Sequence, residues 1–237
     1  METLECIFTR QSVRTYDTKH VPEQLIEKII EAGVAAPSAG NIQPWEFVVV
    51  QDKKTKNKLC DASLKQEHVK KAPVVIVVCA NTEKAKDKYK ERGEKFYSIQ
   101  ATAACIQNIL LAAHDLGLAT CWVGAFEDNE ISEILELPTK LRPVAIITLG
   151  FPYGEKKPLK TKRLPYRNVT WTEKYGKDWK FEFKPLDLEL KEKGQKIKEK
   201  YKDKPKEFRE MLEKLEGKEE QESFPEKFRK FIKKLTK

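Results

Sequence analysis

Residues 73–80 read Pro-Val-Val-Ile-Val-Val-Cys-Ala and contain no polar side chain. A run that is apolar at every position is typical of a β-strand buried on both faces. A long helix pattern follows at residues 96–116, with apolar residues at helical spacing and Gly117 at its end. A doubly buried strand and a long apolar helix together predict a layered domain in which helices pack against a central sheet.

Shorter patterns on either side extend this layered arrangement. Apolar residues recur on one face of residues 21–36, and Pro22 suits the first turn of a helix there. We also expect strands at residues 46–51, 119–123 and 143–149, a short polar helix at 54–63 and a helix at 129–137. Helices that alternate with apolar strands predict an α/β or α+β sandwich.

The charged residues are concentrated in the C-terminal part of the chain. The 237 residues include 46 Lys and Arg and 37 Asp and Glu, a net charge of +9. Charge density rises sharply after Thr170, so we expect a folded domain at residues 1–170 and a charged helical arm at 171–237, with apolar repeats around Phe208 and Phe228. Because Lys and Glu are interleaved in the arm, we expect it to be solvated rather than to bind nucleic acid.

Composition also bears on cellular location. No stretch reaches the roughly 18 uninterrupted apolar residues of a membrane span, and the first residues lack the apolar core of a secretory signal. We therefore expect a soluble cytoplasmic protein.

The five cysteines are odd in number and widely spaced, which argues against a disulfide framework or a zinc site and favours buried, reduced thiols. An excess of Lys and Glu with only two Met is typical of thermophilic proteins.

Three residues near the N-terminus are candidates for binding an anion. Alternate residues of an extended segment face the same way, so Arg10, Ser12 and Arg14 would present two guanidinium groups and a hydroxyl to one ligand. A phosphate suits that arrangement. Taken alone, the triplet is also consistent with a solvated basic loop.

Two other segments combine small residues with polar groups. In residues 36–45, Ser38, Asn41 and Gln43 would offer donors and acceptors to a flat ligand that lies on the small residues, although a structural turn is equally consistent. In residues 119–126, Gly124 interrupts an apolar strand and frees backbone N–H groups for a ligand. We expect the neighbouring Cys121 to be buried rather than catalytic, because no histidine lies in a signature that would pair with it.

The sequence contains no standard catalytic signature. It has no G-x-G-x-x-G, G-x-x-x-x-G-K-[ST], G-x-S-x-G or H-E-x-x-H motif. A basic loop at residues 160–167 is either exposed or a second contribution to an anion site. Phosphate donors and backbone amides without acid–base residues are typical of a site whose cofactor carries the chemistry, so we assign no catalytic side chain and no metal ligand.

Five ordered segments resemble the FMN-dependent nitroreductase family: RQSVR (10–14), APSAGNIQPWEFVVV (36–50), LGLATCWVGAF (116–126), PVAIITLGFP (143–152) and KRLP (162–165). The resemblance covers residues 1–170 and implies an α+β, three-layer sandwich with a mixed central sheet flanked by helices. It further implies a homodimer formed through the helix at 96–116, with two FMN molecules at the subunit interface. Residues 171–237, the helical C-terminal extension, lie outside the usual family pattern.

The resemblance also implies roles for single residues. The FMN phosphate and ribityl chain would be held by Arg10, Ser12, Arg14 and Arg163. The isoalloxazine ring would be lined from the partner subunit by Pro37, Ser38, Ala39 and Asn41. The backbone at Val123 and Gly124 would face the ring near N5, and Gln11 and Gln43 are further candidates.

The implied reaction is ping-pong. NADH or NADPH passes a hydride to flavin N5 and leaves, and an electron-poor acceptor such as a nitroaromatic or a quinone is then reduced in the same place. No protein acid or base is required. Residues 81–95, where the family varies its lid, are a plain charged stretch that identifies no acceptor. A non-catalytic flavin-binding or sensory protein on the same fold is the alternative.

Overall fold

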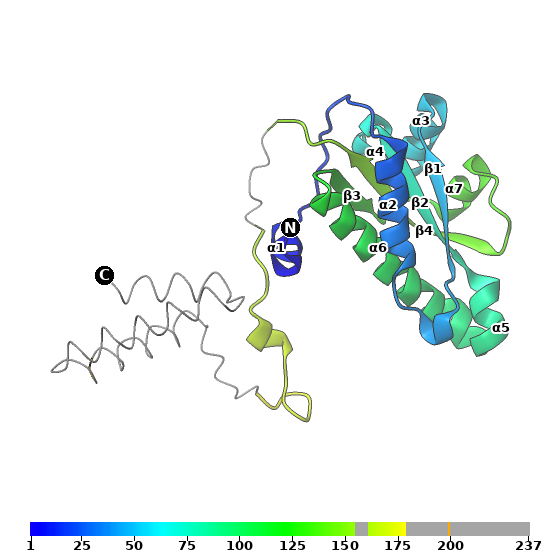
Figure 1. Ribbon diagram of the computed structural model, residues 1–237. Coiled ribbons are helices and arrows are strands. Elements are labelled where there is room, and N and C mark those ends of the chain that lie inside the picture. The colour runs from blue at the N-terminus through cyan, green and yellow to red at the C-terminus, as the bar shows by residue number, and fades with distance from the viewer. Residues whose placement is uncertain (155–160, 179–198, 200–237) are drawn as a thin grey trace. The chain divides into compact units, whose positions relative to one another are not determined.

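The computed structural model describes residues 1–154, 161–178 and 199. Contacts divide the chain into two compact units, Met1–Thr161 and Lys162–Lys237, and each unit is described by itself. Figure 1 shows the helices and the sheet of the first unit. The expected domain boundary at Trp171 stays a prediction, and the helices expected around Phe208 and Phe228 lie outside the described residues.

Four strands form the central sheet of the first unit: β1 (Trp45–Val50), β2 (Val74–Asn81), β3 (Ala119–Val123) and β4 (Leu141–Gly150). Their order is β1-β2-β4-β3, and every neighbouring pair is antiparallel. The sheet was expected to be mixed. The parallel pairing among the described residues is confined to an isolated bridge between Ser12 and Thr120.

Strand β2 belongs to two hydrophobic cores. All eight of its residues are buried, which confirms the prediction from residues 73–80. Ile76 and Val78 lie in one core, while Val75 and Val77 lie in the other, because successive side chains of a strand point to opposite faces. The domain therefore has the expected three layers, with helices on both faces of the sheet.

The first core is covered by α2 (Glu23–Val34) and α6 (Ser98–Asp115), which lie side by side in Figure 1. Gly33 allows their close approach: a Cβ atom there would lie 2.8 Å from Ile109 Cγ1 and 3.1 Å from Cys105 Sγ. The second core is covered by α3 (Lys53–Ala62), α4 (His68–Lys71) and α7 (Asp128–Ile134). The sequence patterns predicted the helices of both layers, including the polar α3, but not the short α4.

Residues 81–95 contain a helix that the sequence analysis missed. Helix α5 (Thr82–Arg92) starts where the Asn81 side chain accepts a hydrogen bond from Lys84 N at 3.1 Å, and a π-helical turn, η2 (Gly93–Tyr97), joins it to α6. Ala85 is the buried residue of α5, so the segment has no apolar stripe for a sequence pattern to detect. The π-helical turn also explains why α6 begins at Ser98 rather than at the expected Phe96.

The helical run Thr82–Asp115 is long and apolar enough to cross a membrane by length and composition alone. Its most apolar window has a mean hydropathy of 1.2, and 44% of that window is buried. A core helix of a soluble protein passes the same test, and α6 packs against α2 and the sheet. The expected cytoplasmic location stays a prediction.

Three short helices complete the described elements. Helix α1 (Thr3–Thr9) precedes the Arg10–Arg14 segment, and η1 (Ala39–Asn41) lies in the loop between α2 and β1. In the second unit, η3 (Tyr166–Val169) is followed by a bridge between Trp171 and Asp178.

Candidate functional site

The segment at residues 10–14 runs along β3. Val13 N donates a hydrogen bond to Thr120 O at 2.9 Å, and Ser12 forms the parallel bridge with Thr120. Arg10 ends helix α1 in an extended conformation, with φ −59° and ψ 134°. The segment is therefore extended, as the alternation of Arg10, Ser12 and Arg14 requires.

Tyr16 fixes the end of this segment to the sheet. Its phenol oxygen lies 2.6 Å from Val13 O and 2.6 Å from Thr148 Oγ1 in β4. Asp17 N donates to Phe151 O at 2.9 Å directly afterwards. Burial raises the pKa of Tyr16, so its phenol is neutral and serves as a hydrogen-bonding anchor. No sequence pattern points to Tyr16, because its partner Thr148 lies far along the chain.

Arg10, Ser12 and Arg14 act on one buried atom, the sulfur of Cys121 in β3. Burial raises the pKa of the Cys121 thiol, while the charge of Arg14, the Ser12 hydroxyl and the charge of Arg10 lower it. The structure thus brings together the three residues that the sequence pattern placed on one side. Cys121 is 2% exposed, which confirms the prediction that it is buried, and the raised pKa of its thiol is the opposite of what an activated nucleophile needs. All five cysteines are buried and free, as expected.

Two buried polar atoms near this segment have no hydrogen-bond partner. They are Gln11 Oε1 and His68 Nε2, and no other side-chain nitrogen or oxygen of the described residues shares this condition. Buried polar groups normally have partners, because burying one without a hydrogen bond costs free energy. An acceptor at Gln11 and a ring nitrogen at His68 fit a polar ligand that lies against the segment.

No sequence pattern points to His68, because it lies in no catalytic or metal-binding signature. The side chain is 8% exposed, and its pKa is lowered by burial and then by the charge of Arg14. Val69 packs in the same core as Val123, with Tyr16 against that core. Only the folded chain reveals this position, since no sequence motif connects residue 68 with residue 14.

The C-terminal end of β3 leaves room above its backbone. Val123 is buried, and a Cβ atom on Gly124 would meet nothing nearer than Trp122 Nε1 at 3.7 Å. The turn that follows is held by Gln66, whose Nε2 donates to Ala125 O at 3.0 Å, and by Glu127 N, which donates to Ala62 O at 3.0 Å. The chain therefore leaves space at Gly124 for a group that approaches the backbone.

The loop at residues 37–43 is shaped by its own polar groups. Ser38 Oγ accepts from Gln43 N at 3.0 Å, and Asn41 Oδ1 accepts from Gln43 Nε2 at 3.1 Å. Gly40, Asn41 and Gln43 have φ values of 52°, 56° and 46°. Pro37 is exposed, and Ala39 begins η1. The polar side chains expected to bind a ligand thus also stabilise a left-handed turn.

This loop lies against α5 within the chain. Lys88 Nζ donates to Gly40 O at 2.7 Å, and Figure 1 shows the loop beside α5 at the C-terminal end of α2. None of the hydrogen bonds between described residues connects the loop with residues 10–14. Within one chain, the loop is hydrogen-bonded to itself and to α5, whereas residues 10–14 are bound to β3 and to Tyr16.

Arg163 is exposed and belongs to the second unit. Its assignment to a phosphate therefore stays a prediction.

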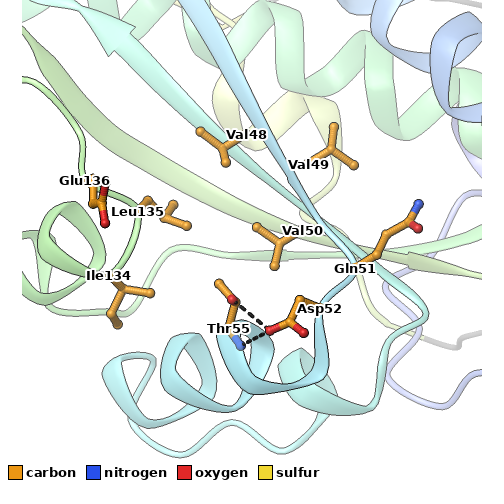
Figure 2. A pocket seen from close by; sticks show the side chains of 9 residues that line it. All are labelled: Val48, Val49, Val50, Gln51, Asp52, Thr55, Ile134, Leu135 and Glu136. Atoms are coloured by element: carbon orange, nitrogen blue, oxygen red, sulfur yellow. Dashed lines mark hydrogen bonds between the residues drawn. The ribbon is translucent and has the colours of Figure 1, made fainter.

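A cavity of about 370 Å³ lies elsewhere, against strand β1. Figure 2 shows its lining: Val48, Val49, Val50, Gln51, Asp52, Thr55, Ile134, Leu135 and Glu136. Asp52 is engaged as the cap of α3, where its carboxylate accepts from Thr55 N at 2.8 Å and Thr55 Oγ1 at 2.9 Å. None of the residues expected to bind a ligand lines this cavity.

Comparisons with known proteins agree with the fold and the ordered segments. The sequence profile of the Nitroreductase family matches residues 7–69 and 60–151. A Thermus thermophilus protein named NADH dehydrogenase is 32% identical over 187 residues, which cover 68% of this chain and 90% of the relative. A Bacillus subtilis protein named FMN reductase [NAD(P)H] is 31% identical over 189 residues, which cover 73% of this chain and 74% of the relative.

A solved structure extends the likeness to three dimensions. The structure of an FMN-dependent nitroreductase from Clostridium difficile R20291 aligns with a TM-score of 0.61 at 30% identity. The alignment covers 71% of this chain and 98% of that one. With the family profile matched across most of the first unit, the chain belongs to the Nitroreductase family.

Proposed function

We propose that this chain is an FMN-dependent oxidoreductase that transfers reducing equivalents from NAD(P)H to an electron-poor acceptor by a ping-pong reaction. Family membership supports the coarser statement that it is an NAD(P)H-dependent oxidoreductase. The observation that carries the proposal is the grouping of Arg10, Ser12 and Arg14 around Thr120 and Cys121 of β3. Nitroaromatics and quinones are the proposed acceptor classes.

The positive charges of the segment fit the FMN phosphate. Arg10 and Arg14 act on the same buried atom as the Ser12 hydroxyl, so two guanidinium groups and one hydroxyl are within reach of a single anion. We assign them, with Arg163, to the phosphate and the ribityl chain. The backbone of the segment is tied to Thr120 and Tyr16, so these donors are held in place before the ligand arrives.

The unpartnered atoms fit the flavin ring. Gln11 Oε1 would accept a hydrogen bond from a ring N–H group, and the open space at Gly124 would admit the ring to the backbone of residues 123 and 124. Bound FMN would supply the hydride-transfer chemistry between NAD(P)H and the acceptor. The chain binds and orients the reactants and exposes them to the charge of Arg14, and no described side chain is assigned as acid or base.

A second copy of the chain would complete the site. The loop at residues 37–43 lies apart from residues 10–14 in one chain, so Pro37, Ser38, Ala39, Asn41 and Gln43 would line the ring from the partner subunit. Helix α1 exposes Leu4, Ile7 and Phe8, with exposed fractions of 67%, 44% and 80%. An apolar face of this kind favours association. We propose a homodimer that also uses α6, located in the cytoplasm.

The test is a visible spectrum of the purified full-length protein before and after addition of NADH or NADPH. Flavin absorption that one nucleotide bleaches is the expected result. Continuous nucleotide consumption with a quinone would distinguish an enzyme from a non-catalytic flavin-binding protein. A protein that takes up no FMN from a mixture containing it would contradict the proposal.

A further inference from the structure

One ring nitrogen of His68 is buried without a hydrogen-bond partner, and a ligand could provide that partner. The side chain is 8% exposed at the start of α4, and its Nε2 atom has no hydrogen-bond partner. A neutral imidazole nitrogen either donates or accepts a hydrogen bond, and a buried one normally does so. The folded chain provides no such partner for Nε2.

The position of His68 places this atom at the proposed FMN site. The charge of Arg14 lowers the pKa of both His68 and Cys121, so Arg14 lies near both side chains. Val69, the next residue, packs in the core that also contains Val123. His68 therefore adjoins both the anion-binding segment and the end of β3.

Burial, together with one neighbouring positive charge, favours the neutral imidazole of His68 at pH 7. Burial is the larger cause of its lowered pKa, and the nearby guanidinium of Arg14 is the second. The neighbouring thiol of Cys121 and phenol of Tyr16 have raised pKa values and carry no charge at this pH.

The charged residues around α4 are occupied with one another. Lys70 Nζ lies 2.6 Å from Glu67 Oε1, and Lys71 Nζ lies 3.4 Å from Glu67 Oε2. Among the described residues, Arg14 is therefore the charge that acts on the imidazole. An added negative charge beside the ring would oppose it and favour the imidazolium form.

We propose that His68 Nε2 contacts the pyrimidine edge of bound FMN and binds a proton each time the flavin is reduced. The proposal rests on the proposed function, since it requires FMN at residues 10–14. His68 would then be a positioning residue that couples flavin reduction to proton uptake, in addition to contributing to the shape of the site.

The charges balance in this scheme. A hydride, which is two electrons and one proton, leaves the nicotinamide of NAD(P)H and adds one negative charge beside His68. Nε2 binds one proton from water through its lone pair, and the resulting N–H donates toward that charge. On reoxidation by the acceptor, Nε2 returns the proton.

The whole chain contains three histidines, so the protonation state of His68 can be followed directly by NMR. Full-length protein labelled with ¹³C-histidine and loaded with FMN would be titrated between pH 5.5 and 8.5 in the oxidised state and after reduction by NADH. The His68→Gln variant identifies the His68 signal, and His20→Gln is the matched control, because His20 is exposed. At pH 7, we expect the NMR signal of His68 Cε1–H to report a neutral imidazole when the flavin is oxidised and a protonated one when the flavin is reduced.

The two proposals fail in different ways in this experiment. A His68 signal that is unchanged by a complete bleaching of the flavin would overturn the proton-uptake inference and leave the oxidoreductase proposal intact. Absence of bound FMN, or absence of bleaching by either nucleotide, would overturn both.

The flavin ring current can also shift the His68 signal, so a second measurement that does not depend on that signal is needed. The midpoint potential of bound FMN would be measured as a function of pH. In the unmodified protein, the slope should correspond to one more proton per two electrons than in His68→Gln. The His20→Gln variant should keep the unmodified slope. Equal slopes in all three proteins would refute proton uptake by His68.

Discussion

The phenol oxygen of Tyr16 lies 2.6 Å from the hydroxyl oxygen of Thr148, 132 positions further along the chain. This contact, with the one to Val13 O, fastens residues 10–14 to β4. The segment that carries Arg10, Ser12 and Arg14 is thus held by two strands, β3 through Thr120 and β4 through Thr148.

Replacing Tyr16 with Phe should weaken both stability and FMN binding. The variant loses the hydroxyl that contacts Val13 O and Thr148, which should lower the free energy of unfolding by about 1–3 kcal/mol. Urea denaturation and fluorescence titration with FMN would measure the two effects. Tyr153→Phe is the control, because Tyr153 is 73% exposed. Equal stability of Tyr16→Phe and the parent would show that the anchor is unimportant.

Replacing Arg14 with Ala should reduce FMN retention strongly. Loss of one charge-assisted hydrogen bond of about 1.5–3 kcal/mol corresponds to a dissociation constant roughly 10- to 100-fold higher. Lys at this position should restore the affinity only in part, since an ammonium lacks the bidentate geometry. Arg142→Ala is a suitable control, because Arg142 pairs with Asp128 at an exposed site. Unchanged flavin occupancy in purified Arg14→Ala would argue against the phosphate assignment.

Two glycine substitutions should separate folding from binding. Gly33→Ala places a Cβ atom 2.8 Å from Ile109 Cγ1, and overpacking of about 1–3 kcal/mol should outweigh the helix-propensity gain of about 1 kcal/mol. Apart from its two sequence neighbours, the Cβ atom of Gly124→Ala meets nothing closer than Trp122 Nε1 at 3.7 Å, so the variant should keep its melting temperature while it weakens FMN binding. Thermal unfolding without FMN and FMN titration of both variants would check this opposite pattern.

The stability of the FMN-free protein should fall as the solution is acidified. The pKa of folded His68 is lowered from its ordinary value of 6.5, so the unfolded chain binds more protons below about pH 6.5 and folding is disfavoured there. His68→Gln should show a smaller decrease than the parent in denaturation curves measured from pH 7.5 to 5. Parallel curves for the two proteins would mean that His68 has the same pKa in both states.

A charge on the apolar face of α1 should disrupt the proposed dimer. Phe8 is 80% exposed, and Phe8→Asp should yield a monomer, because a carboxylate buried at an apolar interface is costly. FMN should be lost with the dimer, since the loop at residues 37–43 would no longer reach the ring. Light scattering and flavin content would measure both, and Val49→Asp, at a partly exposed position of β1, is the control. A dimeric Phe8→Asp that keeps its FMN would contradict the interface.

Sequence patterns predicted those parts of the fold that contain a strong apolar signal. The continuous apolar run located β2, and β3 has the expected bounds. Helix α5 was missed because its single buried residue, Ala85, gives no periodic pattern. The antiparallel order of the strands could not be read from the sequence, since a strand buried on both faces looks the same in parallel and antiparallel sheets.

The candidate site was predictable only where its residues are close in sequence. Alternation alone placed Arg10, Ser12 and Arg14 on one side, and the pairing with Thr120 brought them to Cys121. His68 joins them through the packing of α4 over the sheet, which no spacing encodes. The lack of a hydrogen-bond partner for its Nε2 atom depends on the folded structure, so the sequence could not predict it.

The attachment of Val13 to Thr120 has a consequence for solubility. Strand β3 is an edge strand of the sheet, and an uncovered edge strand can pair with a strand of another chain. The hydrogen bond from Val13 N to Thr120 O covers part of that edge. The segment that carries Arg10, Ser12 and Arg14 therefore also covers part of this edge. We expect variants that release the segment to precipitate as well as to lose any bound flavin.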